Sequence, residues 1–228
     1  MSYSESRSRR LILETPRGEE TVGRFAEIHN WLMISDVPDD PHAGTIREVT
    51  WRMASGIELH FSEDDATGAR YVFVVAAGHG SAIAHYEQVR NGLPVVTDRE
   101  LIEEYDRATK PAAQTDALLR LALGASEELD DAVFQRISLA FENDNLEIRS
   151  TAIYATTYTP SRRYRPFLER IVKEDRARRL RKDAKETLSA YDEAGIGQLR
   201  TARRTAPRPW AGCGIRRSRN DDRNGGSE

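Results

Sequence analysis

Residues 45–77, TIREVTWRMASGIELHFSEDDATGARYVFVVAA, decide the fold of the first half of the chain. In three runs of this stretch the spacing of apolar residues departs from the three- to four-residue period of a helix, which indicates strands: Thr45–Met53, Gly56–Ser62 and Arg70–Ala77. In the second run Ile57, Leu59 and Phe61 alternate with polar residues, so we expect one buried face and one wet face. A short turn and a polar loop that ends at Gly68 join the runs. The stretch therefore predicts a three-stranded antiparallel meander.

Helices are predicted before and after the meander in the sequence. The segment Gly18–Met33 places four side chains at three- and four-residue steps, which indicates an amphipathic helix: Val22, Phe25, His29 and Leu32. Two further helices are expected to begin at Ser81 and at Thr97, the latter because Thr97 and Glu100 have the spacing of a capping box. We therefore expect a small α+β domain over residues 1–108.

From Thr109 onward the strand signals vanish and helical patterns follow one another. Five helices are predicted, separated by short polar or proline-containing breaks: Gln114–Ala125, Asp130–Phe141, Leu146–Thr157, Arg163–Lys173 and Ala177–Tyr191. We therefore expect an all-α segment over residues 112–197.

Two of these helices share a pattern: an acidic residue in the preceding turn, an aliphatic residue followed by arginine, and an alanine three positions after that arginine. The two copies are Asp144, Ile148, Arg149, Ala152 and Asp175, Leu180, Arg181, Ala184. Both the arginines and the alanines are separated by 32 positions. The pattern resembles the second helix of a HEAT repeat, and the resemblance covers residues 112–192. The helix over residues 114–125 is a candidate for an earlier, atypical copy.

The resemblance implies an α-solenoid segment in which aspartate and arginine side chains tie neighbouring repeats. We expect the α+β domain to cap this segment. The resemblance also implies that the second helices line a concave surface used for binding. Arg149 and Arg181 are accordingly expected to be structural. The last helix has an apolar stripe on one side and places three cations on the other, which we take as candidate binding residues: Arg178, Lys182 and Lys185.

The chain has 228 residues and a net charge of −3, but the charge is unevenly distributed. Residues 1–160 carry 15 basic and 27 acidic side chains, a net charge of −12, whereas residues 161–228 carry 19 and 10, a net charge of +9. Such asymmetry indicates either an anionic partner such as nucleic acid or a basic disordered tail. Residues 198–228 hold eight arginines and have no apolar periodicity, so we expect them to be disordered. The strong bias to arginine over lysine is also typical of a GC-rich bacterial genome.

One short segment is a candidate anion-binding turn: Gly78, His79, Gly80 and Ser81. It follows a predicted strand and precedes a predicted helix, whose N-terminal amides could bind an anion. The segment has neither the lysine of a P-loop nor the three-glycine spacing of a dinucleotide fingerprint. Ser81 is equally an ordinary N-cap residue, so both interpretations stay open.

The sequence shows no catalytic or metal-binding constellation. Four histidines could be grouped as metal ligands, but no two of them have the short spacing common in zinc sites: His29, His60, His79 and His85. No serine stands in a Gly-x-Ser-x-Gly elbow, and the single cysteine, Cys213, lies in the predicted tail. We therefore expect no metal, no cofactor and no enzymatic activity.

Several classes of protein are excluded on composition. The mean hydropathy is −0.64, and no window approaches the roughly 18 apolar residues that a membrane span needs. The apolar run Leu11–Leu13 is too brief for the core of a signal peptide. A single cysteine fits a reducing compartment. We therefore expect a soluble, cytoplasmic protein that does not enter a membrane.

The sequence thus predicts a non-enzymatic scaffold that presents a HEAT-like helical surface to a partner protein. The alternative is a nucleic-acid-binding protein that uses the basic last helix and the arginine-rich tail. The identity of the partner and the oligomeric state do not follow from the residues.

Overall fold

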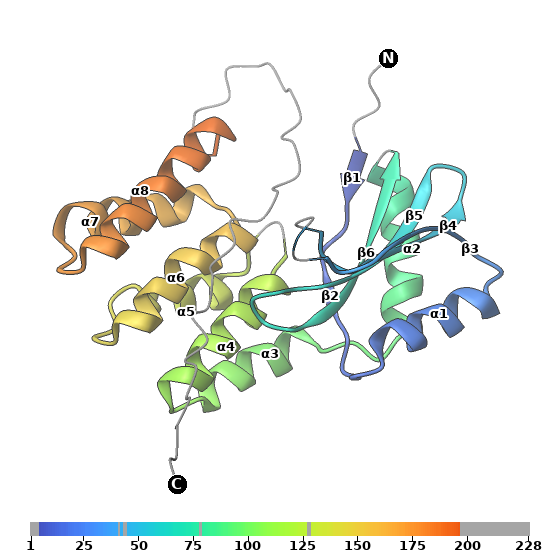
Figure 1. Cartoon of the computed structure of the whole chain (residues 1–228), viewed down its shortest axis with the longest axis horizontal. Coiled ribbons are helices and arrows are strands. Elements are labelled where there is room, and N and C mark those ends of the chain that lie inside the picture. Colours follow the sequence, from blue (N-terminus) through green and yellow to red (C-terminus); the bar gives the residue numbers. More distant parts are fainter. Residues whose placement is uncertain (1–4, 41, 43–44, 78, 127–128, 197–228) are drawn as a thin grey trace, which may run out of the picture.

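The computed structural model describes residues 5–40, 42, 45–77, 79–126 and 129–196. Within these ranges the chain forms one antiparallel sheet of six strands and eight α-helices. In Figure 1 the sheet lies on the right together with α1 and α2, and α3 to α8 lie on the left. The predicted disordered tail, 198–228, falls outside the described residues.

The sheet contains the predicted meander and three strands more. The predicted runs are β4 (Glu48–Ala54), β5 (Ile57–Glu63) and β6 (Arg70–Ala77), which pair antiparallel in sequence order. The added strands are β1 (Glu5–Arg7), β2 (Leu11–Ile12) and β3 (Leu32–Val37). The strand order is β1-β6-β5-β4-β3, and β2 also pairs with β6. The expectation of a three-stranded sheet is therefore wrong. Strands β1 and β2 could not be predicted, because they are too short to show the two-residue alternation of a strand.

The predicted helix over Gly18–Met33 is also too long. Helix α1 covers Gly18–Ile28, and the chain then turns at Asn30, which has φ of 56°. The N–H of Asn30 donates to the carbonyl of Glu27 (3.0 Å) and the N–H of Trp31 to that of Ala26 (2.9 Å). This pair of hydrogen bonds is the Schellman motif, which ends a helix where an asparagine or glycine accepts the left-handed conformation. Leu32 consequently lies in β3 rather than on the helix.

Strand β6 separates two hydrophobic cores. Val72, Val74 and Ala76 are fully buried against the side of the sheet that α1 and α2 (His79–Gly92) cover. Tyr71 and Phe73 point to the opposite side, where they belong to the core of the helical half. Both faces of β6 are therefore shielded from solvent, in agreement with its nearly continuous apolar sequence.

The helical half is built from three helix pairs. These are α3 (Asp98–Arg107) with α4 (Pro111–Leu123), α5 (Asp131–Ala140) with α6 (Leu146–Tyr158), and α7 (Arg165–Glu174) with α8 (Arg178–Glu193). The second helices also pack in series, α4 against α6 and α6 against α8. The five predicted helices are confirmed, with a 3-10 turn at Arg162–Tyr164 before α7. The predicted capping box of Thr97 and Glu100 opens α3, whereas α2 begins at His79, two residues before the predicted start.

The helical half and the sheet share one core. The hydrophobic cluster that contains Tyr71 and Phe73 of β6 extends without a break to Leu180 and Tyr191 of α8. At its margin the hydroxyl of Tyr158 donates to Asp64 Oδ1 at 2.5 Å, which joins α6 to the loop between β5 and β6. Neither half buries its apolar surface by itself.

The first prediction concerns the close packing of α8. Ala184 is fully buried, and Ser189 lies on the exposed side of the same helix. We expect Ala184→Leu to lower the free energy of unfolding by about 1–3 kcal/mol, because extra volume in a filled core forces its neighbours apart. Ser189→Leu serves as the matched control. Thermal unfolding followed by circular dichroism checks this, and equal midpoints for the two variants would contradict the register of α8.

Candidate functional site

The outer face of α8 is the first candidate site, and the helix presents it as the sequence predicts. Leu180, Ala184 and Tyr191 are buried against the stack. The predicted binding residues lie on the opposite, exposed side: Arg178, Lys182 and Lys185. The same 3.6-residue period therefore fixes both the packed stripe and the free face.

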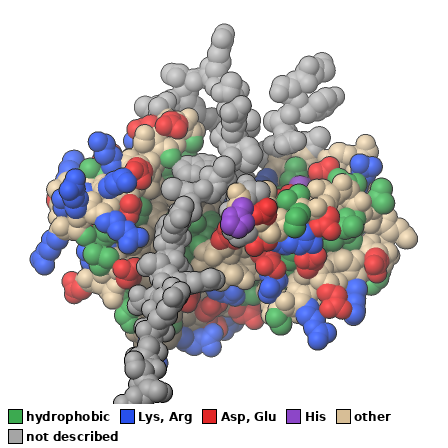
Figure 2. All heavy atoms as spheres, in the orientation of Figure 1, with side chains coloured by type: hydrophobic (Ala, Val, Ile, Leu, Met, Phe, Trp, Pro, Cys, Tyr) green, Lys and Arg blue, Asp and Glu red, His purple; other side chains and the backbone are tan. Residues whose placement is uncertain are grey.

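Electrostatics divide this outer face into paired and unpaired cations. Lys182 Nζ lies 3.6 Å from Glu186 Oε1, and Arg179 Nε lies 3.7 Å from Asp183 Oδ2, each one helical turn away. Arg178 and Lys185 form no ion pair with any described residue. Figure 2 shows that Lys and Arg side chains gather at this left end of the molecule, over α7 and α8. Exposed pairs contribute little to folding stability, so these cations are available to an anionic partner.

Arg149 and Arg181, by contrast, are held inside the helical half. Arg149 Nε donates to Asp175 Oδ2 at 2.8 Å, and Arg149 Nη1 donates to the carbonyls of Asn143 and Asp144. Arg181 Nη1 donates to the carbonyl of Asp175 at 2.6 Å. Each arginine thus binds the turn before its own helix, and Arg149 also reaches the next turn along the chain. Neither guanidinium is free to bind a ligand.

Asp175 connects two consecutive helix pairs. Burial raises the pKa of its carboxyl, but hydrogen bonds from Arg149 and from the N–H of Ala177 outweigh burial and hold the pKa below its ordinary value. The side chain is only 3% exposed. The charged carboxylate is therefore the form that the fold binds.

The second prediction follows from this lowered pKa. A carboxyl whose pKa is lower in the folded state stabilises the fold above its unfolded pKa, and this contribution is lost as pH falls through the folded pKa. We expect Asp175→Asn to destabilise the protein by about 1–3 kcal/mol at pH 7, and by progressively less below the ordinary aspartate pKa of about 4. Asp144→Asn, in the exposed turn that precedes α6, is the control. Urea unfolding between pH 3 and pH 7 measures the difference, which a purely steric role would leave constant.

The predicted anion-binding turn lies only partly within the described chain. His79, Gly80 and Ser81 occupy the first turn of α2. Gly78 falls outside the described residues. Because the helix begins at His79, Ser81 lies inside the first turn and not before it.

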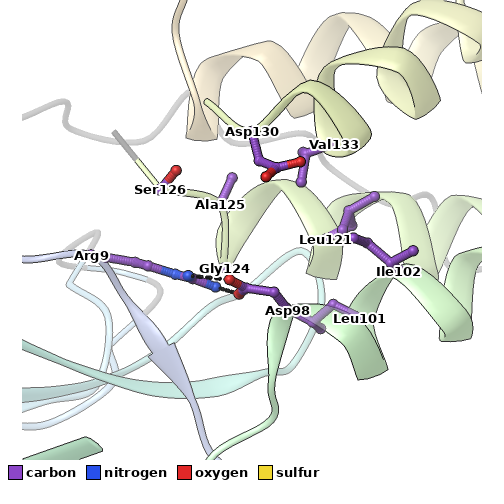
Figure 3. A pocket seen from close by; sticks show the side chains of 10 residues that line it. All are labelled: Arg9, Asp98, Leu101, Ile102, Leu121, Gly124, Ala125, Ser126, Asp130 and Val133. Atoms are coloured by element: carbon purple, nitrogen blue, oxygen red, sulfur yellow. Dashed lines mark hydrogen bonds and ion pairs between the residues drawn. The ribbon is translucent and has the colours of Figure 1, made fainter. Parts of the chain in front are cut away.

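A small, partly open cavity lies where the first strands meet the helical half. It measures about 50 Å³ and is lined by residues of the β1–β2 connection, of α3, of the end of α4 and of the start of α5. Figure 3 shows Arg9 pointing across it to Asp98, with which it forms an ion pair, while Asp130 projects from the opposite wall. A volume of this size holds only a few water molecules and no substrate.

A histidine between two carboxylates lies on the face of the sheet away from α1. His60 Nδ1 lies 2.9 Å from Glu48 Oε1, and His60 Nε2 lies 3.4 Å from Glu58 Oε2. The hydrogen bond with His60 lowers the pKa of Glu48. The imidazole stacks on Phe73 with 4.8 Å between the ring centroids. The arrangement packs β4, β5 and β6 together, and in the part of the chain that the structure describes no group of three or more His, Cys, Asp or Glu is placed to hold a metal ion.

An open groove of about 530 Å³ was missed by the sequence interpretation. It lies between α1 and the outer strands of the sheet and is lined by Glu19, Glu20, Gly23, Glu27, Trp31, Met33, Val49 and Trp51. The predicted helix over Gly18–Met33 includes both Trp31 and Met33, whereas Trp31 lies in the loop after α1 and Met33 lies in β3. The signal that could have found the groove is Asn30, because an asparagine after an amphipathic stripe is a common helix end.

Comparison with known proteins adds no family to these observations. No family model, no curated protein and no solved structure matches the chain. Among the helices of the described residues, none is both long enough and apolar enough to cross a membrane.

Proposed function

We propose that the protein is a non-enzymatic interaction module, in which a HEAT-like stack of helix pairs presents the outer face of α8 to an acidic surface of a partner protein. The observation that carries the proposal is the serial packing of α4, α6 and α8, which ends at a helix with one buried and one free side. In this reading α3 and α4 form the first pair of the stack, where the sequence suggested an atypical early copy.

The ties between helix pairs support the resemblance to a repeat. Arg149 and Asp175 join the second pair to the third by a partly buried ion pair. Two further pairs link the first helices on the outside: Arg136 of α5 donates to Asp106 of α3, and Arg170 of α7 donates to Glu142 after α5. Charge pairs thus recur at intervals similar to the repeat length, as expected for a stack in which each unit contacts only its neighbours.

The exposed cations make the surface suitable for an anionic partner. Arg178, Lys182 and Lys185 can be changed without touching the packed stripe, so their effect on binding is separable from their effect on folding. At 16 residues, α8 is about 24 Å long, which matches the width of a small protein–protein contact. Charge on such a surface contributes mainly to specificity and to the rate of association.

The third prediction tests this surface by charge reversal. We expect Arg178→Glu, Lys182→Glu and Lys185→Glu, combined in the full chain, to abolish cross-linking to a partner protein in lysate from the source organism. A second triple variant, with glutamate at the exposed positions Arg99, Arg107 and Lys110, should cross-link like the wild type. Mass spectrometry of samples prepared with and without nuclease reads out the partner. Equal cross-linking by both triple variants would contradict a role for α8.

Nucleic-acid binding is the second candidate, because exposed cations continue from α8 onto α7. They are Arg170 and Lys173 of α7 and Arg176 of the turn before α8, which lie near Arg178 in the chain. Binding of this kind releases counterions, so the association constant would fall steeply with salt. In the charge-reversal experiment, recovery that disappears on nuclease treatment would favour this candidate over a protein partner.

A further inference from the structure

We propose that the groove between α1 and β3 binds an extended, arginine- or lysine-bearing segment of another protein, which pairs with the free edge of β3. This surface lies in the sheet half and is separate from the outer face of α8. It is named here the edge groove, and its lining residues are those given above.

The edge of β3 is open to an added strand. In the described sheet, β3 has a neighbouring strand on one side only, which is β4. Edge strands are normally protected by charged side chains, proline or close cover. Here the exposed side chains at the start of the edge are apolar, with Leu32 65% and Met33 52% exposed, and Ile28 at the end of α1 is 76% exposed.

The register of β3 limits how much an added strand gains from the backbone alone. The pairing of β3 with β4 shifts between Met33 and Ser35, so the regular part of the edge is short. When a peptide adds a strand to a sheet edge, main-chain hydrogen bonds supply general affinity, and pockets for alternate side chains supply specificity. The edge groove is such a pocket, because an added strand places every second side chain on the α1 side of the sheet, beside Met33 and Trp51.

The chemistry of the edge groove selects a cation. Trp31 is the partly exposed indole of the groove, with one face of its ring stacked on His29, whereas Trp51 is only 6% exposed. An aromatic ring of this kind attracts an ammonium or guanidinium group. The carboxylate of Glu19 is bound by Arg47, and that of Glu20 by Arg24. Glu27 has no ion-pair partner among the described residues. A cation on the incoming segment would therefore meet the partly exposed Trp31 ring and an uncompensated negative charge.

Gly23 gives the edge groove its room. It lies in the interior of α1, where glycine destabilises a helix relative to alanine. A Cβ atom built on Gly23 would have no other atom within 4 Å, so the packing of the protein does not require a glycine there. The missing side chain instead widens the groove between Glu20 and Glu27, which lie one turn away on either side along α1. A residue that lowers helix stability without relieving a contact fits a binding role better than a packing role.

The experiment uses the full chain and a fluorescent eight-residue peptide that alternates valine with arginine. A peptide that alternates valine with glutamate is the charge control. Fluorescence anisotropy should show the arginine peptide binding at least about tenfold more tightly than the glutamate peptide. Failure of the wild-type protein to distinguish the two peptides would overturn the proposal.

Four variants locate the binding. Gly23→Leu fills the edge groove and Glu27→Lys reverses its free charge, and each should weaken binding of the arginine peptide at least about tenfold. Ala84→Leu also adds a leucine and Glu169→Lys also reverses a charge, each at an exposed helix position elsewhere, and both should leave binding unchanged. Equal affinity in all four variants would overturn the proposal.

A fifth variant separates binding from folding. Gly23→Ala should raise the midpoint of thermal unfolding, because alanine favours the helix, and should still weaken binding by narrowing the edge groove. If Gly23→Ala changes neither property, Gly23 has no role in the groove and the proposal fails at this residue.

Two other occupants have distinct outcomes. A second copy of the chain at the β3 edge would appear as a dimer in sedimentation equilibrium that Leu32→Lys disrupts. The chain's own arginine-rich residues 198–228 would appear as peptide binding that strengthens when their eight arginines are replaced by glutamine. Either result would overturn the assignment of the edge groove to a separate protein.

Discussion

The burial of β6 on both faces is the constraint on which the rest of the structure depends. The strand pairs with β5 on one side and with β1 and β2 on the other, so its backbone groups have partners along both edges. Val72 and Val74 need cover from α1 and α2, whereas Tyr71 and Phe73 need cover from the helical half. A parallel strand in an α/β fold is commonly enclosed in this way. Here an antiparallel strand is enclosed because the helix pairs cover the face of the sheet that would otherwise contact solvent.

The two candidate surfaces lie at opposite ends of this arrangement and have opposite charge. The outer face of α8 is the last surface of the helical stack and is rich in cations, while the edge groove is the last surface of the sheet and is lined by glutamates. Each is a place where a periodic element, a helix stack or a sheet, ends without a following unit. Open ends of this kind are where repeats and sheets accept further partners.

Sequence periodicity predicted the elements that are long enough to show it, and failed where a single residue or a distant contact decides the structure. The stripe of α8 fixed both the burial of Ala184 and the exposure of Arg178 in advance. Strands β1 and β2 have three and two residues and carry no period, so their pairing with β6 depends on residues some 60 to 70 positions away. The end of α1 is set by the backbone of Asn30, and the helix prediction that overran it also concealed the edge groove. The resemblance to a repeat implied only that aspartate and arginine side chains tie neighbouring repeats. The contact of Arg149 with Asp175 does not follow from spacing, because the two residues are 26 positions apart.

The hydrogen bond between Tyr158 and Asp64 has a consequence for how the chain can be divided. It lies at the margin of a core that runs from β6 to α8, and burial and the carboxylate of Asp64 raise the pKa of the Tyr158 hydroxyl, which favours the protonated form that donates this bond. A segment that contained only the sheet would expose Phe73 and Tyr71, and one that contained only the helices would expose the surface that covers them. We therefore expect the two halves to unfold together as one cooperative unit, and fragments separated near residue 110 to aggregate through the faces that they share in the intact chain.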